Sequence, residues 1–185
     1  MVGKYDLYCK IYEGLTFEEE ATLFVELNTI QQRVSAAQKY KALVYAKETE
    51  SLILENLCKE FGIVTMPKSS AEQPVLRGLR VSQTTIRLCG EGALRWIFEV
   101  IRDSQWHLVK GAYSELFIHS LRNIYRAHQM DLDTTKEKLC RLMQRFSFEL
   151  LKAKANITFV GRGNQAAMFS LLESYLDGTK LPALE

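Results

Sequence analysis

Apolar residues recur at helical spacing in segment after segment of this chain. Several of these segments open on a Ser or Thr followed by Glu or Gln at the position that makes a capping box, in which each side chain satisfies a free backbone N–H at the helix start. The three pairs are Thr16 with Glu19, Ser35 with Gln38, and Thr134 with Glu137. Only three prolines interrupt the 185 residues. The pattern predicts a mainly α-helical fold with enough chain to bury a core.

The apolar positions also predict which side of each helix is buried. The first helix should run from Thr16 to about Asn28. Its buried stripe should consist of Phe17, Ala21, Phe24 and Leu27. Farther along, Ser82 is expected to cap a short helix that reaches Cys89. A longer helix is expected at about residues 111–128.

Two segments depart from helical spacing and indicate β-structure. Residues 5–12 alternate apolar and polar side chains, which is typical of a strand. Residues 62–81 contain two apolar runs around a polar stretch, which predicts a β-hairpin. The expected fold class is therefore mainly α, a multi-helix domain with a short N-terminal strand and one β-hairpin. Its two expected parts, residues 1–62 and 63–185, should pack as one unit.

Charge and hydropathy limit the classes of partner. The net charge is +2, so a nucleic-acid surface would need clustered basic residues rather than an overall excess. No stretch approaches the length of apolar sequence that spans a bilayer, and the first residues lack the apolar run of a signal peptide. We therefore expect a cytoplasmic protein with no membrane partner.

Cysteine and histidine spacing gives no support for metal or cofactor chemistry. The cysteines are Cys9, Cys58, Cys89 and Cys140. They form no CxxC pair and have apolar neighbours, which favours reduced, buried thiols. The histidines show neither HxxxH nor HExxH spacing. Residues 161–163, Gly-Arg-Gly, match no phosphate-loop motif and are interpreted as the end of one element before Asn164 caps the next. No catalytic residue, metal site or cofactor is predicted.

Clustered basic residues are the candidates for an anion-binding surface. Lys138, Arg141 and Arg145 follow the spacing that places side chains on one face of a helix. Arg77, Arg80 and Arg87 cluster around the second strand of the expected hairpin and the helix after it. Two interpretations are open for these residues: a solvated helix face, or a surface that follows a nucleic-acid backbone.

The segment from Tyr12 to Tyr45 resembles the helical part of ParB-like proteins of phages and other mobile elements. In that family a strand leads into a GLT/S-x-EEEA-x-LF-x-x-LN helix, a polar link, and an S-x-x-x-K/R-F/Y-x-A helix. The matching residues are Gly14, Leu15, Glu19, Glu20, Ala21, Leu23, Phe24, Leu27, Asn28, Ser35, Lys39, Tyr40 and Ala42. The resemblance continues more weakly to a terminal Y-x-x-G-x-K/R-L pattern at residues 175–181.

The resemblance implies a function without turnover. Family members carry a G-x-x-R type motif, in a loop that holds a nucleotide or DNA phosphate, upstream of the strand at which this chain begins. The chain is thus expected to be a non-catalytic accessory domain that binds DNA or a partner protein. Partition-type relatives contact nucleotide through an EN-x-x-R/K segment, which Asn28 and Arg33 loosely match. A helix-terminal role is the alternative interpretation of Asn28.

Two alternatives from other classes stay open. One is a ParB-like nuclease or a CTP or ATP hydrolase whose phosphate-binding half is supplied elsewhere, and the other is a structural oligomerisation module. The N-terminal strand adds an expectation about assembly, because a strand edge exposes unpaired N–H and C=O groups. Pairing of this edge between two copies would give a homodimer.

Overall fold

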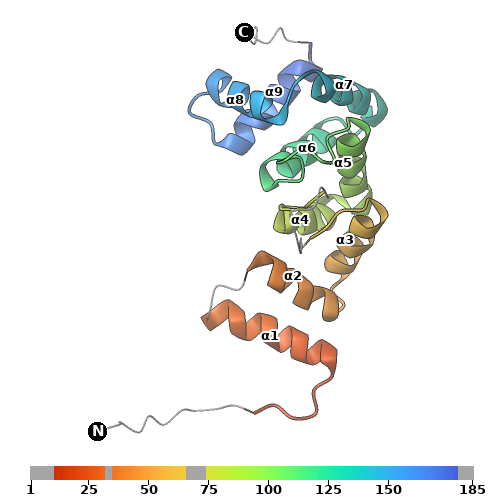
Figure 1. Ribbon diagram of the computed structural model, residues 1–185, viewed down its shortest axis with the longest axis vertical. Helices are drawn as coiled ribbons and strands as arrows, with labels where there is room; N and C mark the ends of the chain where they lie inside the picture. Colours follow the sequence, from red (N-terminus) through yellow and green to blue (C-terminus); the bar gives the residue numbers. More distant parts are fainter. Residues whose placement is uncertain (1–10, 32–34, 66–73, 179–185) are drawn as a thin grey trace, which may run out of the picture. The chain divides into compact units, whose positions relative to one another are not determined.

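The computed structural model describes residues 11–31, 35–65 and 74–178, and of residues 28–31 only the backbone. Over these ranges the chain is mainly helical, as predicted (Figure 1). The helices are α1 (Phe17–Gln31), α2 (Ala36–Tyr45), α3 (Thr49–Glu60), α4 (Leu79–Cys89), α5 (Glu91–Asp103), α6 (Glu115–Ala127), α7 (Leu132–Arg145), α8 (Phe148–Thr158) and α9 (Asn164–Leu176). None of these described helices combines the length and the apolar character needed to cross a membrane.

The chain divides into two compact units, Met1–Glu48 and Thr49–Glu185. The sequence analysis expected a first part that ends at residue 62 and so includes α3. In the structure α3 belongs to the second unit. In the first unit α1 packs against α2, and both predicted capping boxes are present. The Thr16 N–H donates to Glu19 Oε2 at 2.8 Å, and the Ser35 N–H donates to Gln38 Oε1 at 3.1 Å. Their short range explains why the sequence alone locates these two helix starts.

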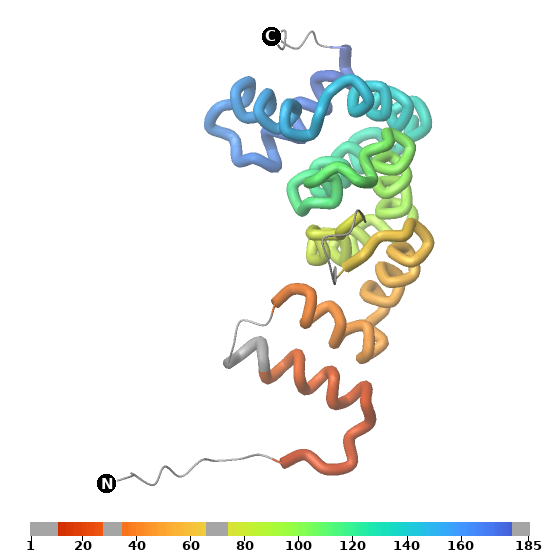
Figure 2. The backbone as a smooth tube through the Cα atoms, in the orientation of Figure 1, coloured from red at the N-terminus to blue at the C-terminus, as the bar shows by residue number. Residues whose placement is uncertain are grey.

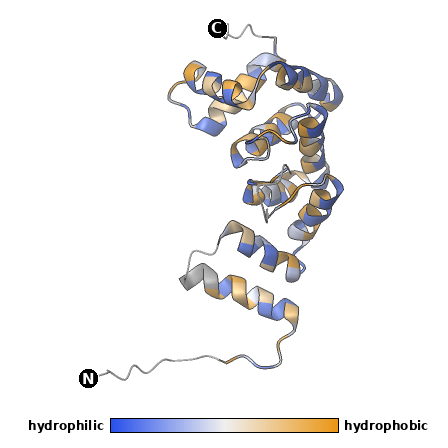
Figure 3. Cartoon of the chain, in the orientation of Figure 1, coloured by the Kyte–Doolittle hydropathy of each residue, from blue (hydrophilic) through white to orange (hydrophobic). Residues whose placement is uncertain are grey.

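The stripe predicted to be buried on α1 is largely exposed, which corrects that expectation. Phe17 is 84% exposed, and Phe24 and Leu27 are each 45% exposed. Figure 3 shows apolar segments along α1. The helix also continues past Asn28 to Gln31. Helical spacing predicts that apolar residues share a face, but burial requires another element against that face.

In the second unit each helix packs on helices near it in the chain (Figure 2). The helices α3, α5 and α7 follow one another along one side, which we call the α3–α5–α7 row, and α4 and α6 form the α4–α6 row (Figure 1). Beyond α6, α9 packs against both α6 and α8. Fully buried side chains such as Phe98, Ile101 and Phe117 form the core between these helices. The rings of Trp106, Phe117 and Phe148 lie 5.4–6.0 Å apart between centroids.

The predicted β-structure is not found among the described residues. Of the strand expected at residues 5–12, residues 5–10 lie outside the description, and Ile11 and Tyr12 are not in a strand. In place of the hairpin there is one isolated parallel bridge between Val64 and Val75, and residues 66–73 lie outside the description. The prediction that the second strand of the hairpin extends to residue 81 is wrong, because α4 already begins at Leu79.

Two further helix starts differ from their predictions. Ser82 lies inside α4 rather than at its N-cap, and its hydroxyl donates to the Gly78 carbonyl at 2.9 Å. The N-cap of α7 is Asp131, so Thr134 lies within the first turn instead of capping it. In both cases a Ser or Thr just inside the helix was mistaken for its N-cap. Such a side chain is compatible with both positions, because inside a helix its hydroxyl can donate to a carbonyl of the preceding turn.

Candidate nucleic-acid interface

The three basic residues predicted to share a face of α7 are partly engaged within the protein. Lys138 Nζ donates to the Leu176 main-chain oxygen at 3.2 Å, at the carboxyl end of α9, where a cation is favoured by the helix dipole. Arg141 pairs with Glu137 at 3.4 Å. The guanidinium of Arg145 lies 5.7 Å from the ring centroid of Phe146. This face therefore offers phosphate less unpaired charge than its sequence indicates.

The arginines at the start of α4 are in a different situation. Arg77 precedes the helix, Arg80 is in its first turn, and Arg87 follows two turns later; all three are exposed. No Asp or Glu occurs anywhere in residues 74–90. In the part of the chain that the structure describes, no carboxylate forms an ion pair with any of the three. Their guanidinium groups are thus available to an anion from outside.

The sequence analysis missed a second set of basic residues, on α6. His119, Arg122 and Arg126 lie on the same side of this helix, at spacings of three and four residues. Arg122 is only 8% exposed, and its Nε has no hydrogen-bond partner among the described atoms. Burial, helped by the charge of Arg122, lowers the pKa of His119 below its usual range. The helical spacing was a usable signal, but the apolar stripe on the opposite face drew the interpretation toward core packing.

Backbone contacts bring α4 and α6 together at their first turns. The N–H groups of Arg77 and Gly78 both donate to the Tyr113 carbonyl at 3.0 Å. A Cβ built on Gly78 would lie 3.1 Å from Glu115 Cα, so the first turn of α4 touches the first turn of α6. The two helices then lie one above the other along the α4–α6 row (Figure 1). The two arginine-bearing helices are thus neighbours in the second unit.

Arg122 points toward the α4 side of α6. Side chains two positions apart on an α-helix diverge by about 200°. The Ser120 hydroxyl reaches Gln165 O of α9 at 3.4 Å, so Ser120 marks the α9 side of α6. Arg122 is therefore on the opposite side, where α4 is the neighbouring helix of the row. Arg122 is thus a buried residue on the side of α6 away from α9, and its Nε has no hydrogen-bond partner among the described atoms.

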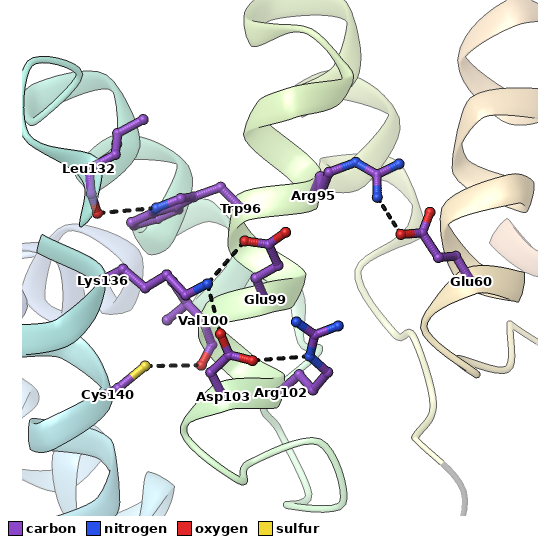
Figure 4. A network of polar contacts seen from close by, with 10 residues as sticks. All are labelled: Glu60, Arg95, Trp96, Glu99, Val100, Arg102, Asp103, Leu132, Lys136 and Cys140. Atoms are coloured by element: carbon purple, nitrogen blue, oxygen red, sulfur yellow. Dashed lines mark hydrogen bonds and ion pairs between the residues drawn. The ribbon is translucent and has the colours of Figure 1, made fainter.

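The α3–α5–α7 row has a different character, because most of its basic side chains are paired with acids. Lys136 bridges Glu99 at 3.0 Å and Asp103 at 2.7 Å (Figure 4). Arg95 binds both Glu60 of α3 and Glu91 of its own helix. Further pairs on these helices are Lys59 with Glu55, Arg102 with Asp103, and Arg141 with Glu137. Of these two rows, the α4–α6 row has more arginines without an ion-pair partner among the described residues.

The remaining candidate residues give no second site. Only the backbone of Asn28 is described, within α1, and Arg33 lies outside the described residues. Among the residues with described positions, no three His, Cys, Asp or Glu side chains are grouped as metal ligands would be. Cys58 is buried, whereas Cys89 and Cys140 are half-buried, and all three are free thiols.

Comparisons with known proteins identify no relative for this arrangement. No protein-family model, no curated protein sequence and no solved structure matches the chain. The described residues define a class by architecture alone: a helical protein with one row of helices whose cations are mostly ion-paired, and one row with several arginines that no described carboxylate pairs.

Proposed function

We propose that this chain is a non-catalytic nucleic-acid-binding module that holds the phosphate backbone on the α4–α6 row. The observation that carries the proposal is the number of arginines on the α4–α6 row that have no ion-pair partner. Arg77, Arg80, Arg87, Arg122 and Arg126 have no such partner among the described carboxylates, whereas Lys59, Arg95, Lys136 and Arg141 of the α3–α5–α7 row are paired. A protein with a net charge of only +2 needs such a separation to attract a polyanion.

Arginine suits this role because its planar guanidinium donates two parallel hydrogen bonds to a phosphate. Contacts to phosphate fix the position of a protein on nucleic acid but carry no base information. Binding should therefore be insensitive to sequence and should weaken steeply with salt. This is the DNA-binding accessory role that the resemblance to ParB-like proteins implies, and membership of that family is itself part of the proposal.

A charge-reversal experiment tests the surface. The variant Arg80→Glu/Arg87→Glu/Arg126→Glu should bind a short fluorescent DNA duplex much more weakly than the wild type. Its slope of log affinity against log salt should fall by about three, about one for each phosphate that the variant no longer binds.

The matched control is Lys59→Glu/Arg102→Glu/Arg141→Glu, which makes the same change in net charge on the α3–α5–α7 row. It should retain most of the affinity, because it leaves the α4–α6 row intact. Equal reductions of affinity in the two variants would mean that net charge alone drives binding. No DNA binding by the wild type at low salt would reject the proposal and favour a protein partner.

We also propose that the chain catalyses no reaction. The reason is that its sequence contains no recognised phosphate-loop motif and no recognised set of catalytic residues. With magnesium present, the protein should neither hydrolyse CTP or ATP nor nick plasmid DNA above background. Hydrolysis that co-purifies with the chain and disappears in Arg33→Ala would instead support the alternative of a nucleotide hydrolase. A cytoplasmic location and a homodimer also stay predictions from the sequence.

A further inference from the structure

The first unit carries an apolar groove between its two helices. The groove has a volume of about 640 Å³ and is lined by side chains of both α1 and α2. Phe17, at its α1 side, is 84% exposed, and Tyr45, at its α2 side, is 60% exposed. Large apolar side chains gathered at one exposed site mark an interaction surface rather than ordinary solvent-facing positions.

The two sides of this groove carry opposite charge. The charged residues at positions 17–27 of α1 are all acidic, and those in α2 are both lysines. Glu18 already pairs with Lys47. Glu20 and Lys41 both line the groove, and neither forms an ion pair with any described residue. Lys41 Nζ instead lies 5.8 Å from the ring centroid of Tyr45.

This arrangement is complementary to itself. A two-fold symmetric contact requires one surface patch to match its own rotated copy. A second hairpin whose groove faces the first, related to it by a two-fold axis parallel to the two helices, would place its lysine-bearing α2 against the acidic α1 of the first, and the reverse contact would form by symmetry. Each Glu20 would then meet Lys41 of the other copy, while the aromatic side chains at the groove close over one another.

We propose that the α1–α2 groove binds the same groove of a second copy of this chain, giving a symmetric homodimer. The proposal differs from the strand-edge pairing expected from residues 5–12, because it uses side chains of two described helices. It also does not rest on the proposed nucleic-acid function, since it involves only the first unit and is tested without nucleic acid.

The test is the mass of the full-length protein in solution, measured by sedimentation equilibrium over a range of concentrations. The wild type should approach twice 21.3 kDa. The single variants Glu20→Lys and Lys41→Glu each bring like charges together at both symmetric contacts. Each should therefore weaken dimerisation about tenfold or more.

Mixing the two single variants gives the decisive result. A heterodimer of Glu20→Lys with Lys41→Glu has opposite charges at both contacts, so the mixture should dimerise better than either variant alone. A variant that had merely unfolded could not be rescued in this way. Arg87→Glu, a reversal on the second unit, should leave the mass unchanged.

Three outcomes would overturn the proposal. The first is a wild-type monomer at high micromolar concentration, which would mean that something other than a second copy covers the groove. The second is a mixture of the two variants that dimerises no better than each alone. The third is a dimer that Cys9→Pro dissociates and Glu20→Lys does not, which would place the interface at the strand edge.

Discussion

The indole Nε1 of Trp106 donates a hydrogen bond of 2.7 Å to the main-chain oxygen of Met143. Met143 lies in the last turn of α7, where carbonyl groups have no partner within the helix. Trp106, from the loop between α5 and α6, thus satisfies the end of a helix far along the chain while its ring packs against Phe117 and Phe148. Trp106 is only 5% exposed, as its place in the core requires.

Replacing Trp106 with Phe should therefore cost stability through two effects. A buried carbonyl loses its donor and the smaller ring leaves a void, which together lower the free energy of unfolding by about 2–4 kcal/mol. Urea denaturation followed by circular dichroism measures this change. Trp96→Phe is the matched control, because the Trp96 indole reaches Leu132 O only at 3.4 Å and should cost less. Equal decreases in stability would contradict the capping role of Trp106.

Gly111 should tolerate no side chain. Its φ is +100°, and an added Cβ would overlap the ring of Phe148, lying 2.7 Å from Cδ1. Gly111→Ala should lower the free energy of unfolding by about 3 kcal/mol, from backbone strain and displacement of a buried ring. Gly92→Ala, in α5 with open space around the new methyl group, should instead stabilise by about 0.5–1 kcal/mol. Thermal melts of the two variants should shift in opposite directions.

Arg122→Met separates a functional role from a structural one. Because the Arg122 Nε has no partner, removing this buried charge should change the free energy of unfolding by no more than about 2 kcal/mol, and in the stabilising direction. Affinity for DNA should nevertheless fall. Leu121→Ala is the positive control for this measurement. Leu121 is fully buried next to Arg122, so its truncation should lower the free energy of unfolding by about 2–5 kcal/mol, which urea denaturation should detect. A strongly destabilised Arg122→Met would indicate a structural ion pair instead.

The ion pair between Lys136 and Asp103 predicts a loss of stability in acid. Burial raises the pKa of Asp103, but hydrogen bonds from Lys136 and Arg102 outweigh it and hold the pKa below the ordinary value of 3.8. The folded state therefore binds this proton less readily than the unfolded state, so the contribution is present above pH 3.8 and is lost as the pH falls through the lower, folded pKa.

Asp103→Asn should be less stable than the wild type at pH 7, by less than about 1 kcal/mol because the pair is partly exposed. The difference should shrink as the pH falls below about 4. Urea titrations of both proteins at several pH values measure it. A difference that stays constant with pH would rule out an electrostatic origin.

Cys58 should be chemically silent in the folded protein. Burial, followed by the charge of Glu55, raises its pKa to about 12, so the thiol stays protonated through neutral pH. The half-buried Cys89 should react with iodoacetamide first, and Cys58 only when urea unfolds the chain. Mass spectrometry of the labelled peptides gives the order of reaction. Labelling of Cys58 at the rate of Cys89 in native buffer would contradict its burial.

Features that depend on a few neighbouring residues were predictable from the sequence. The capping boxes at Thr16 and Ser35 involve hydrogen bonds between residues three apart, so residue types and spacing indicate them before any packing is known. Gly62, just after the end of α3, adopts a φ of +65°, for which glycine has no steric cost. The mainly helical class follows from the same local rules, repeated along the chain.

Tertiary contacts decided the rest, because they join residues that no spacing rule relates. The segment after residue 74 begins a helix at Leu79, and the N–H groups of Arg77 and Gly78 are taken by Tyr113. Which cations remain unpaired likewise depends on packing: Lys138 is held by the end of α9, whereas Arg122 is buried without an ion-pair partner among the described residues. The sequence by itself determined the mainly helical class and which residues are basic. Only the packing of one helix against another determined which of those charges stay available to a ligand, since ion pairing requires proximity in space.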